Sequence, residues 1–156
     1  MKTLKNVCIA LFVVLVAASL AVIGYKVKKI EEPDRNLTVL EYEIGTISDV
    51  DGEELDSGYA LRSKMQSKDK FVKISVSDGG IVKYRVFCYN ADKVFIGAGT
   101  TYENDITELP ETMVLNSKIE TVSYYRVLLI VPETEDMCTV TNMNGYVEQV
   151  NVTVKK

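Results

Sequence analysis

The chain of 156 residues contains no histidine, and this absence limits the chemistry that it can support. Without imidazole, the chain has no Ser-His-Asp triad, no Cys-His pair and no His-ligated zinc. The three cysteines, Cys8, Cys88 and Cys138, are one too few for an all-thiolate zinc site. Tyrosines, arginines and carboxylates are therefore the side chains that remain for recognition or catalysis.

Four residues have the types and positions expected of a ligand-binding surface, namely Tyr59, Arg62, Tyr89 and Tyr102. Aromatic faces pack against sugar C–H groups, while neighbouring polar groups form hydrogen bonds with the hydroxyls. All four lie at predicted strand ends or loops, where binding sites are commonly placed. Two alternatives stay open, because tyrosine is also a common half-buried strand residue and Arg62 is equally suited to a structural ion pair.

An acidic loop supplies five carboxylates between Asp49 and Asp56, which raises the question of calcium. The spacing is not that of an EF-hand, because the fifth position from Asp49 is Glu53 and the twelfth is Ala60. An ordinary solvated turn around Asp51 and Gly52 accounts for the same residues. We therefore expect no metal site here.

Glycoside hydrolysis would need two carboxylates about 5–10 Å apart in a cleft. The chain has 22 acidic residues, and their spacing singles out no pair. A small β-domain also seldom encloses a substrate cleft of its own. We therefore expect no enzymatic activity and no cofactor.

Two cysteines, Cys88 and Cys138, lie beyond the apolar N-terminal segment. In an oxidising compartment they would be able to form a disulfide, provided that their Cα atoms approach within about 7 Å. The alternative is that both are buried free thiols that act as small apolar groups. Spacing alone leaves both open.

The element that fixes the location of these residues is an uncharged apolar segment, residues 6–25. As a helix it would cover roughly 30 Å, which matches the hydrocarbon core of a bilayer. We predict a membrane anchor in residues 1–25, with Val7 and Gly24 bounding the transmembrane part. The alternative is a cleaved export signal, since Lys2 and Lys5 precede the apolar run and small residues near Ala21 suit a peptidase.

Either alternative exports the rest of the chain, so we expect a single-pass protein of the cell membrane, or a secreted one, with an extracytoplasmic C-terminal domain. Lysines 26, 28 and 29 outnumber Lys2 and Lys5, and by count alone they favour a cytoplasmic C-terminus. A short Met-Lys-x-x-Lys start and a following β-domain favour export. The first expected partner is therefore the lipid bilayer, through the N-terminal helix.

Residues 26–36 are charged, contain Pro33 and show no apolar period, so they form a linker between the anchor and one domain, residues 37–156. All 22 acidic residues and 16 of the 18 basic ones lie beyond residue 25, which gives this part a net charge of −6. That charge argues against nucleic acid or an anionic lipid surface as its partner.

From residue 37 the chain consists of short segments rich in Val, Ile, Tyr, Phe and Thr, bounded by turn residues. The clearest predicted strands are residues 37–47, 71–76, 81–89, 94–97, 121–131 and 146–154. We expect a hairpin turn at Asp78-Gly79-Gly80, a bulge near Gln149, and a loop followed by a strand within residues 53–64. No long amphipathic helix intervenes, so the fold class is all-β, with an antiparallel β-sandwich.

Two strands indicate which faces are buried. In residues 121–131 both alternating sets are largely apolar, which predicts a central strand covered on both sides. In residues 81–89 one set is core-like, namely Val82, Tyr84, Val86 and Cys88. The other set mixes basic and aromatic residues, Arg85 and Phe87 among them, and would suit an open face.

Several strand-and-turn motifs occur in succession over roughly residues 40–131. These are Gly45-Thr46-Ile47-Ser48, Asp51-Gly52-Glu53, Ser57, Ala60-Leu61-Arg62-Ser63, Tyr84-Arg85-Val86-Phe87, Tyr89-Asn90, Phe95-Ile96-Gly97 and Tyr125-Arg126-Val127-Leu128-Leu129. Together they resemble small jelly-roll domains of cell-surface and phage-tail proteins of Gram-positive gut bacteria, which are similar to carbohydrate-binding modules. The chain differs from this pattern in lacking tryptophan.

The resemblance implies a jelly-roll sandwich and a binding role. The expected function is a membrane-anchored extracytoplasmic module whose ligand is a glycan or another envelope component. The alternative is a structural or assembly protein of the cell envelope that binds another protein.

Overall fold

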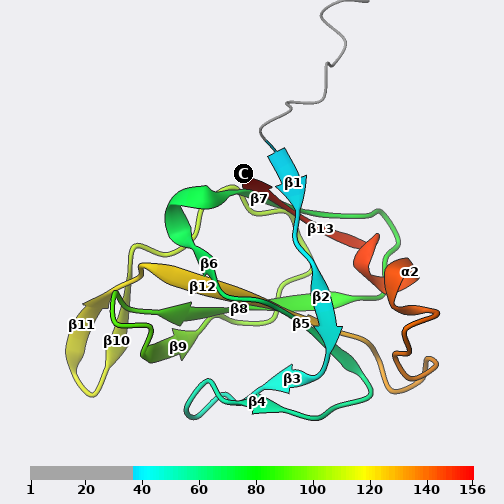
Figure 1. The fold of residues 1–156 in the computed structure, drawn as a ribbon, viewed down its shortest axis with the longest axis horizontal. Coiled ribbons are helices and arrows are strands. Elements are labelled where there is room, and N and C mark those ends of the chain that lie inside the picture. The colour runs from blue at the N-terminus through cyan, green and yellow to red at the C-terminus, as the bar shows by residue number, and fades with distance from the viewer. Residues whose placement is uncertain (1–36) are drawn as a thin grey trace, which may run out of the picture. The chain divides into compact units, whose positions relative to one another are not determined.

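The computed structural model describes residues 37–156 (Figure 1). The predicted anchor, with its bounds Val7 and Gly24, and the linker 26–36 lie outside the described residues. The described part consists mainly of antiparallel β-strands with little helix, which confirms the all-β fold class. No helix within residues 37–156 combines the length and the apolar composition needed to cross a bilayer.

The larger sheet has six strands in the order β2-β5-β12-β8-β9, with β6 pairing with β12. Strand β12 is central, because β5 and β6 pair with one of its edges and β8 with the other. The strands are β2 (Tyr42–Ile44), β5 (Ala60–Ser63), β6 (Gln66–Ser67), β8 (Lys83–Tyr89), β9 (Phe95–Ala98) and β12 (Tyr124–Ile130).

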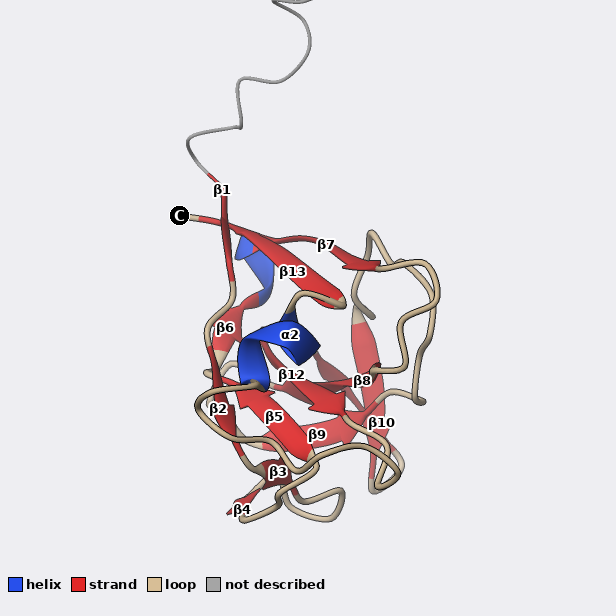
Figure 2. Cartoon of the chain, turned by 90° about the vertical axis from the view of Figure 1, so that its right-hand side faces the viewer, coloured by secondary structure: helices blue, strands red, loops and turns tan. Residues whose placement is uncertain are grey.

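The smaller sheet has three strands in the order β1-β13-β7, and Figure 2 shows it on one side of the larger sheet with the helix α2 nearby. Its strands are β1 (Leu37–Val39), β7 (Phe71–Val76) and β13 (Val150–Lys155). Two short hairpins complete the β-structure, β3 (Thr46–Ile47) with β4 (Glu54–Leu55) and β10 (Thr112–Leu115) with β11 (Lys118–Thr121). The helices are η1 (Lys68–Lys70) and α2 (Met143–Val147).

The main core lies between the two sheets, in a sandwich-like arrangement. Alternate residues of each strand point into it, because successive side chains of a strand face opposite sides. From the smaller sheet come Ile74, Val150, Val152 and Val154; from the larger come Leu61, Tyr84, Val86, Cys88, Tyr125, Val127 and Leu129. The predictions for the core-facing set of residues 81–89 and for a central strand in residues 121–131 are confirmed.

The predicted hairpin at Asp78-Gly79-Gly80 is wrong. A turn does form, with Gly79 at φ +72° and the Gly80 N–H donating to the Ser77 carbonyl. It leads from β7 in the smaller sheet to β8 in the larger, so the two strands do not pair. The Gln149 side-chain carbonyl accepts hydrogen bonds from the backbone N–H groups that follow the turn, at Ile81 and Val82.

The predicted bulge near Gln149 is also wrong. The helix α2 occupies the first part of residues 146–154, and β13 begins only at Val150. The irregular register lies at Thr153 and Val154, where β13 pairs with β7. The last two residues of α2, Tyr146 and Val147, and the two residues that follow therefore replace the start of the predicted strand.

Both cysteines beyond the N-terminal segment, Cys88 and Cys138, are buried free thiols. Burial raises the pKa of the Cys88 thiol to about 11. The interpretation of the pair as small apolar groups is therefore confirmed over the disulfide.

Candidate functional site

The outer face of the larger sheet is covered in part by the β3–β4 hairpin. A second apolar cluster lies under it, formed by Ile47, Ala60, Phe87, Tyr89 and Leu128. The Tyr89 hydroxyl donates to the Gly52 carbonyl in the hairpin loop, over 3.4 Å. The basic and aromatic face of β8 is therefore closed at Phe87 and Tyr89, whereas Ile81 and Lys83 on the same face are exposed, as predicted for an open face.

Two arginines and two carboxylates fix this hairpin to the sheet. Glu54 on β4 bridges the arginines, with Oε1 2.7 Å from Arg126 Nη1 and Oε2 3.2 Å from Arg62 Nη2. Arg62 Nε donates to Glu43 Oε1 over 3.0 Å, and Arg126 Nε donates to the Ser63 carbonyl over 2.8 Å. The hydrogen bond from Arg62 holds the pKa of Glu43 below its usual range. We call these four charged residues the arginine clamp.

Position 45 requires glycine because the Arg62 side chain of the clamp lies directly against its backbone. Arg62 Nη1 also donates to the carbonyls of Leu55 (2.9 Å) and Thr46 (3.3 Å), so the guanidinium lies against the hairpin backbone. Gly45 has a φ of +144°, and a Cβ there would overlap the Arg62 guanidinium. Only glycine permits this close approach.

A second ion pair joins the hairpin loop to β8. Arg85 Nη1 donates to both carboxylate oxygens of Asp49, at 2.7 and 2.6 Å, and Arg85 Nε donates to the Gly99 carbonyl at 3.0 Å. The guanidinium carbon also lies 5.5 Å from the centre of the Phe87 ring, a cation–π distance. The Arg85 side chain is therefore held in one position.

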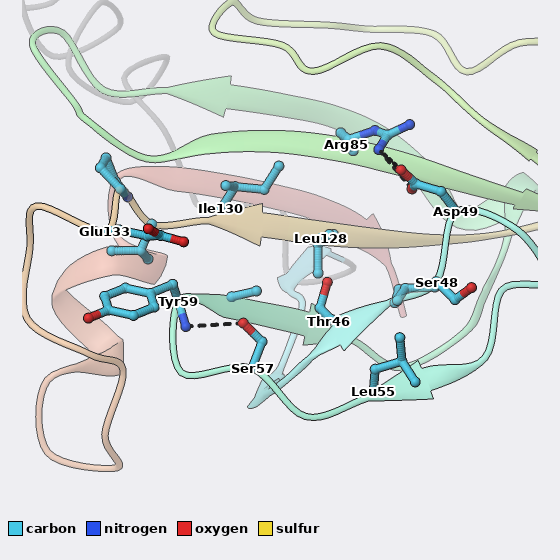
Figure 3. A pocket seen from close by; sticks show the side chains of 14 residues that line it. Thr46, Ser48, Asp49, Leu55, Ser57, Tyr59, Arg85, Leu128, Ile130 and Glu133 are labelled. Carbon is cyan, nitrogen blue, oxygen red and sulfur yellow. Dashed lines mark hydrogen bonds and ion pairs between the residues drawn. The ribbon is translucent and has the colours of Figure 1, made fainter.

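Beside these ion pairs lies an open groove of about 600 Å³, which we call the hairpin groove. Figure 3 shows Leu128 and Ile130 in its central part, the Asp49–Arg85 pair towards one end, and Tyr59 with Glu133 towards the other. Its lining residues are Thr46, Ile47, Ser48, Asp49, Leu55, Ser57, Tyr59, Ala60, Arg85, Leu128, Ile130, Val131, Pro132 and Glu133.

The structure places the four predicted site residues in different surroundings. Tyr59 lines the hairpin groove, half-buried, with its N–H donating to Ser57 Oγ over 3.2 Å. Arg62 lies behind the groove in the arginine clamp, which is the structural ion pair that was its alternative interpretation.

The other two predicted residues lie elsewhere. Tyr89 is buried beneath the β3–β4 hairpin. Tyr102 stacks on Tyr84, with ring centroids 5.4 Å apart, and its hydroxyl lies against Gly99. The four residues therefore do not converge on one surface, and only Tyr59 lines the groove.

Sequence reasoning missed three charged lining residues, Asp49, Arg85 and Glu133. Arg85 carried a signal, since it belongs to the set of β8 that faces away from the core. Asp49 was considered only as part of the acidic loop. Nothing in the local sequence indicates that this loop folds back onto β8, because the contact spans 36 residues.

The acidic loop uses its carboxylates within the protein. Asp49 pairs with Arg85, Glu54 belongs to the arginine clamp, and Asp51 Oδ1 accepts the Glu53 N–H over 3.1 Å. A hydrogen bond from Ser48 lowers the pKa of Asp51. Within residues 37–156, no three His, Cys, Asp or Glu side chains are grouped so as to hold a metal ion.

The hairpin groove therefore offers an apolar floor with a guanidinium, two carboxylates and several hydroxyls around it. This combination suits a polyhydroxylated ligand, which presents apolar C–H faces and hydrogen-bonding groups together. Comparisons of the chain with protein-family models, with curated proteins and with solved structures found no match to any of them.

Proposed function

We propose that residues 37–156 form a jelly-roll-like binding module, held outside the cell by the N-terminal anchor, whose ligand is a glycan or another envelope component. The observation that carries the proposal is the hairpin groove. Its volume of about 600 Å³ lies within the range of ligand-binding sites, roughly 300–1,000 Å³.

The groove is also built on a rigid support. The arginine clamp and the Asp49–Arg85 pair attach the β3–β4 hairpin to a sheet whose central strand is buried on both faces. A preorganised site loses less conformational freedom when it binds. Tyr59 would supply the aromatic face, and Glu133 an exposed acceptor for sugar hydroxyls.

We propose binding without catalysis. Asp49 is the groove carboxylate nearest a fixed cation, and both of its oxygens already accept hydrogen bonds from Arg85. This engagement makes Asp49 part of the attachment of the hairpin loop to β8, and we assign it no role in a reaction.

A panel of cell-wall fragments and oligosaccharides, tested against the full chain in nanodiscs, checks the proposal. We expect binding of at least one glycan, a loss of at least about tenfold in Tyr59→Ala, and a smaller loss in Glu133→Gln. Glu135→Gln is the matched control, because Glu135 is exposed on the same segment but does not line the groove. Absence of binding to every glycan would contradict the proposal.

One observation favours the alternative, an assembly protein that binds another protein. Val114 and Ile119 lie directly opposite each other on the β10–β11 hairpin, 73% and 75% exposed. Adjoining exposed apolar side chains would be covered by a protein partner that packs on this hairpin. A photo-crosslinker at Val114 in intact membranes tests this alternative, which predicts one dominant protein adduct.

A further inference from the structure

A second, smaller groove of about 210 Å³ lies where the described chain begins, and we call it the basic groove. Residues 38–41 line it together with Lys64, Lys70, Lys155 and Lys156. These lysines come from three separate parts of the chain. Lys70 precedes Phe71, which lies opposite Val154 of β13, and Lys64 follows Ser63, which lies opposite Tyr42 of β2. Strand β1 also pairs with β13, and Figures 1 and 2 show the C-terminal end beside the start of β1.

The four lysines are exposed, and within residues 37–156 none of them forms an ion pair. By contrast, Lys68 pairs with Glu111, and Lys83 pairs with Glu103. Glu41 is the single acidic side chain among the residues that line the basic groove. The surface around the basic groove is therefore locally positive, although the part of the chain beyond residue 25 has a net charge of −6.

Chain connectivity limits how far this positive end can lie from the predicted anchor. Eleven residues, 26–36, separate the anchor from Leu37, and even fully extended they reach at most about 40 Å. The linker carries Lys26, Lys28, Lys29 and Arg35 together with Glu31, Glu32 and Asp34, so its net charge is +1 and its three lysines lie next to the anchor. Basic residues next to a membrane segment are attracted to anionic lipid headgroups.

We propose that the basic groove docks on the anionic headgroups of the bilayer that holds the anchor, so that the hairpin groove is held in a defined orientation to the membrane. This inference rests on the anchor in the proposed function, but not on the glycan. It revises the expectation, drawn from net charge, that an anionic lipid surface is not a partner. The small volume of the groove and the flexible ammonium groups suit several headgroup phosphates rather than one enclosed ligand.

Lysine acylation followed by mass spectrometry tests the docking on the full chain. The chain is placed in nanodiscs of phosphatidylcholine, or of equal parts phosphatidylcholine and phosphatidylglycerol. We expect acylation of Lys64, Lys70, Lys155 and Lys156 to slow by at least about threefold with the anionic lipid, since each lysine near such a surface favours docking on the order of fivefold. Lys118 on the β10–β11 hairpin is the control and should not change.

Salt and charge variants complete the test. The protection should disappear in about 0.5 M sodium chloride, where the Debye length is about 4 Å. It should also disappear at Lys156 in the variant Lys64→Gln/Lys70→Gln/Lys155→Gln, but persist in Lys118→Gln. Equal acylation in both nanodiscs, or protection that is insensitive to salt, would overturn the docking alone. Failure of the chain to enter nanodiscs would overturn the docking and the anchor together.

Discussion

The ion pair between Glu54 and Arg126 should contribute a coupling free energy of about 1.5–2 kcal/mol. Exposed pairs typically give about 0.2–1 kcal/mol, and breaking a fully buried pair costs about 3–5 kcal/mol. This pair lies between the two limits, because the Arg126 side chain is 7% exposed and that of Glu54 is 49% exposed. The 2.7 Å separation and the second hydrogen bond of Arg126 to Ser63 keep its geometry fixed.

A double-mutant cycle measures this coupling. Urea unfolding of residues 37–156 is compared for the wild type, Glu54→Gln, Arg126→Met and the double variant. Arg126→Met alone should cost about 2–4 kcal/mol, because it removes the donor to the Ser63 carbonyl and one of the two arginines that Glu54 bridges. The double variant should be less destabilised than the sum of the single variants by the coupling energy.

The surface pair Lys83–Glu103 provides the matched control, since both side chains are exposed. The double-mutant cycle of Lys83→Met and Glu103→Gln should give a coupling free energy of at most about 0.5 kcal/mol. A coupling at Glu54–Arg126 no larger than this control would refute the reasoning that the β3–β4 hairpin is held by a partly buried clamp.

Three further predictions concern the core and the backbone. Leu129→Ala should destabilise the domain by about 3–4 kcal/mol in urea unfolding, because Leu129 is fully buried; a cost below about 1 kcal/mol would contradict this packing. Gly45→Ala should cost about 2–3 kcal/mol through strain and overlap with Arg62, whereas Gly145→Ala, in a helix with open space around it, should be neutral or stabilising. The Cys88 thiol should not react with a thiol reagent at neutral pH, and since its folded pKa is raised to about 11, its stabilising contribution should hold below the ordinary pKa of 9 and be lost as pH rises towards 11. Fast labelling of the native protein would show that this thiol is not buried.

The buried strands were predictable because the pattern of apolar residues along each strand indicates which of its faces are buried. Strand β7 was predicted with its observed bounds, and β12 as a central strand, since its two faces are both apolar. The β10–β11 hairpin was missed because Val114 and Ile119 are exposed, so no buried face repeats along it. Its turn residues Asn116 and Ser117 both have positive φ, at 50° and 64°, which is the chemistry of a tight hairpin turn.

The candidate site was less predictable than the fold. Tyr59 was found because it lies at a strand end, but Arg62 and Tyr89 lie under the β3–β4 hairpin. Whether a residue of the sheet's outer face is open depends on where this hairpin packs. That packing follows from long-range contacts such as Asp49 with Arg85, which no local pattern encodes. The turn at Gly79 was predictable from its residue types. The passage of the chain from the smaller sheet to the larger sheet after this turn was not.

Amide chemical shifts of ¹⁵N-labelled residues 37–156, recorded with and without the glycan that binds most tightly in the panel, test the central claim most directly. The account predicts shifts concentrated in residues 46–49, 55–60 and 128–133, the segments that supply most of the lining of the hairpin groove. Tyr59→Ala should abolish them without altering the rest of the spectrum. Shifts confined to the β10–β11 hairpin, or none with any glycan, would contradict the assignment of the groove as the binding site.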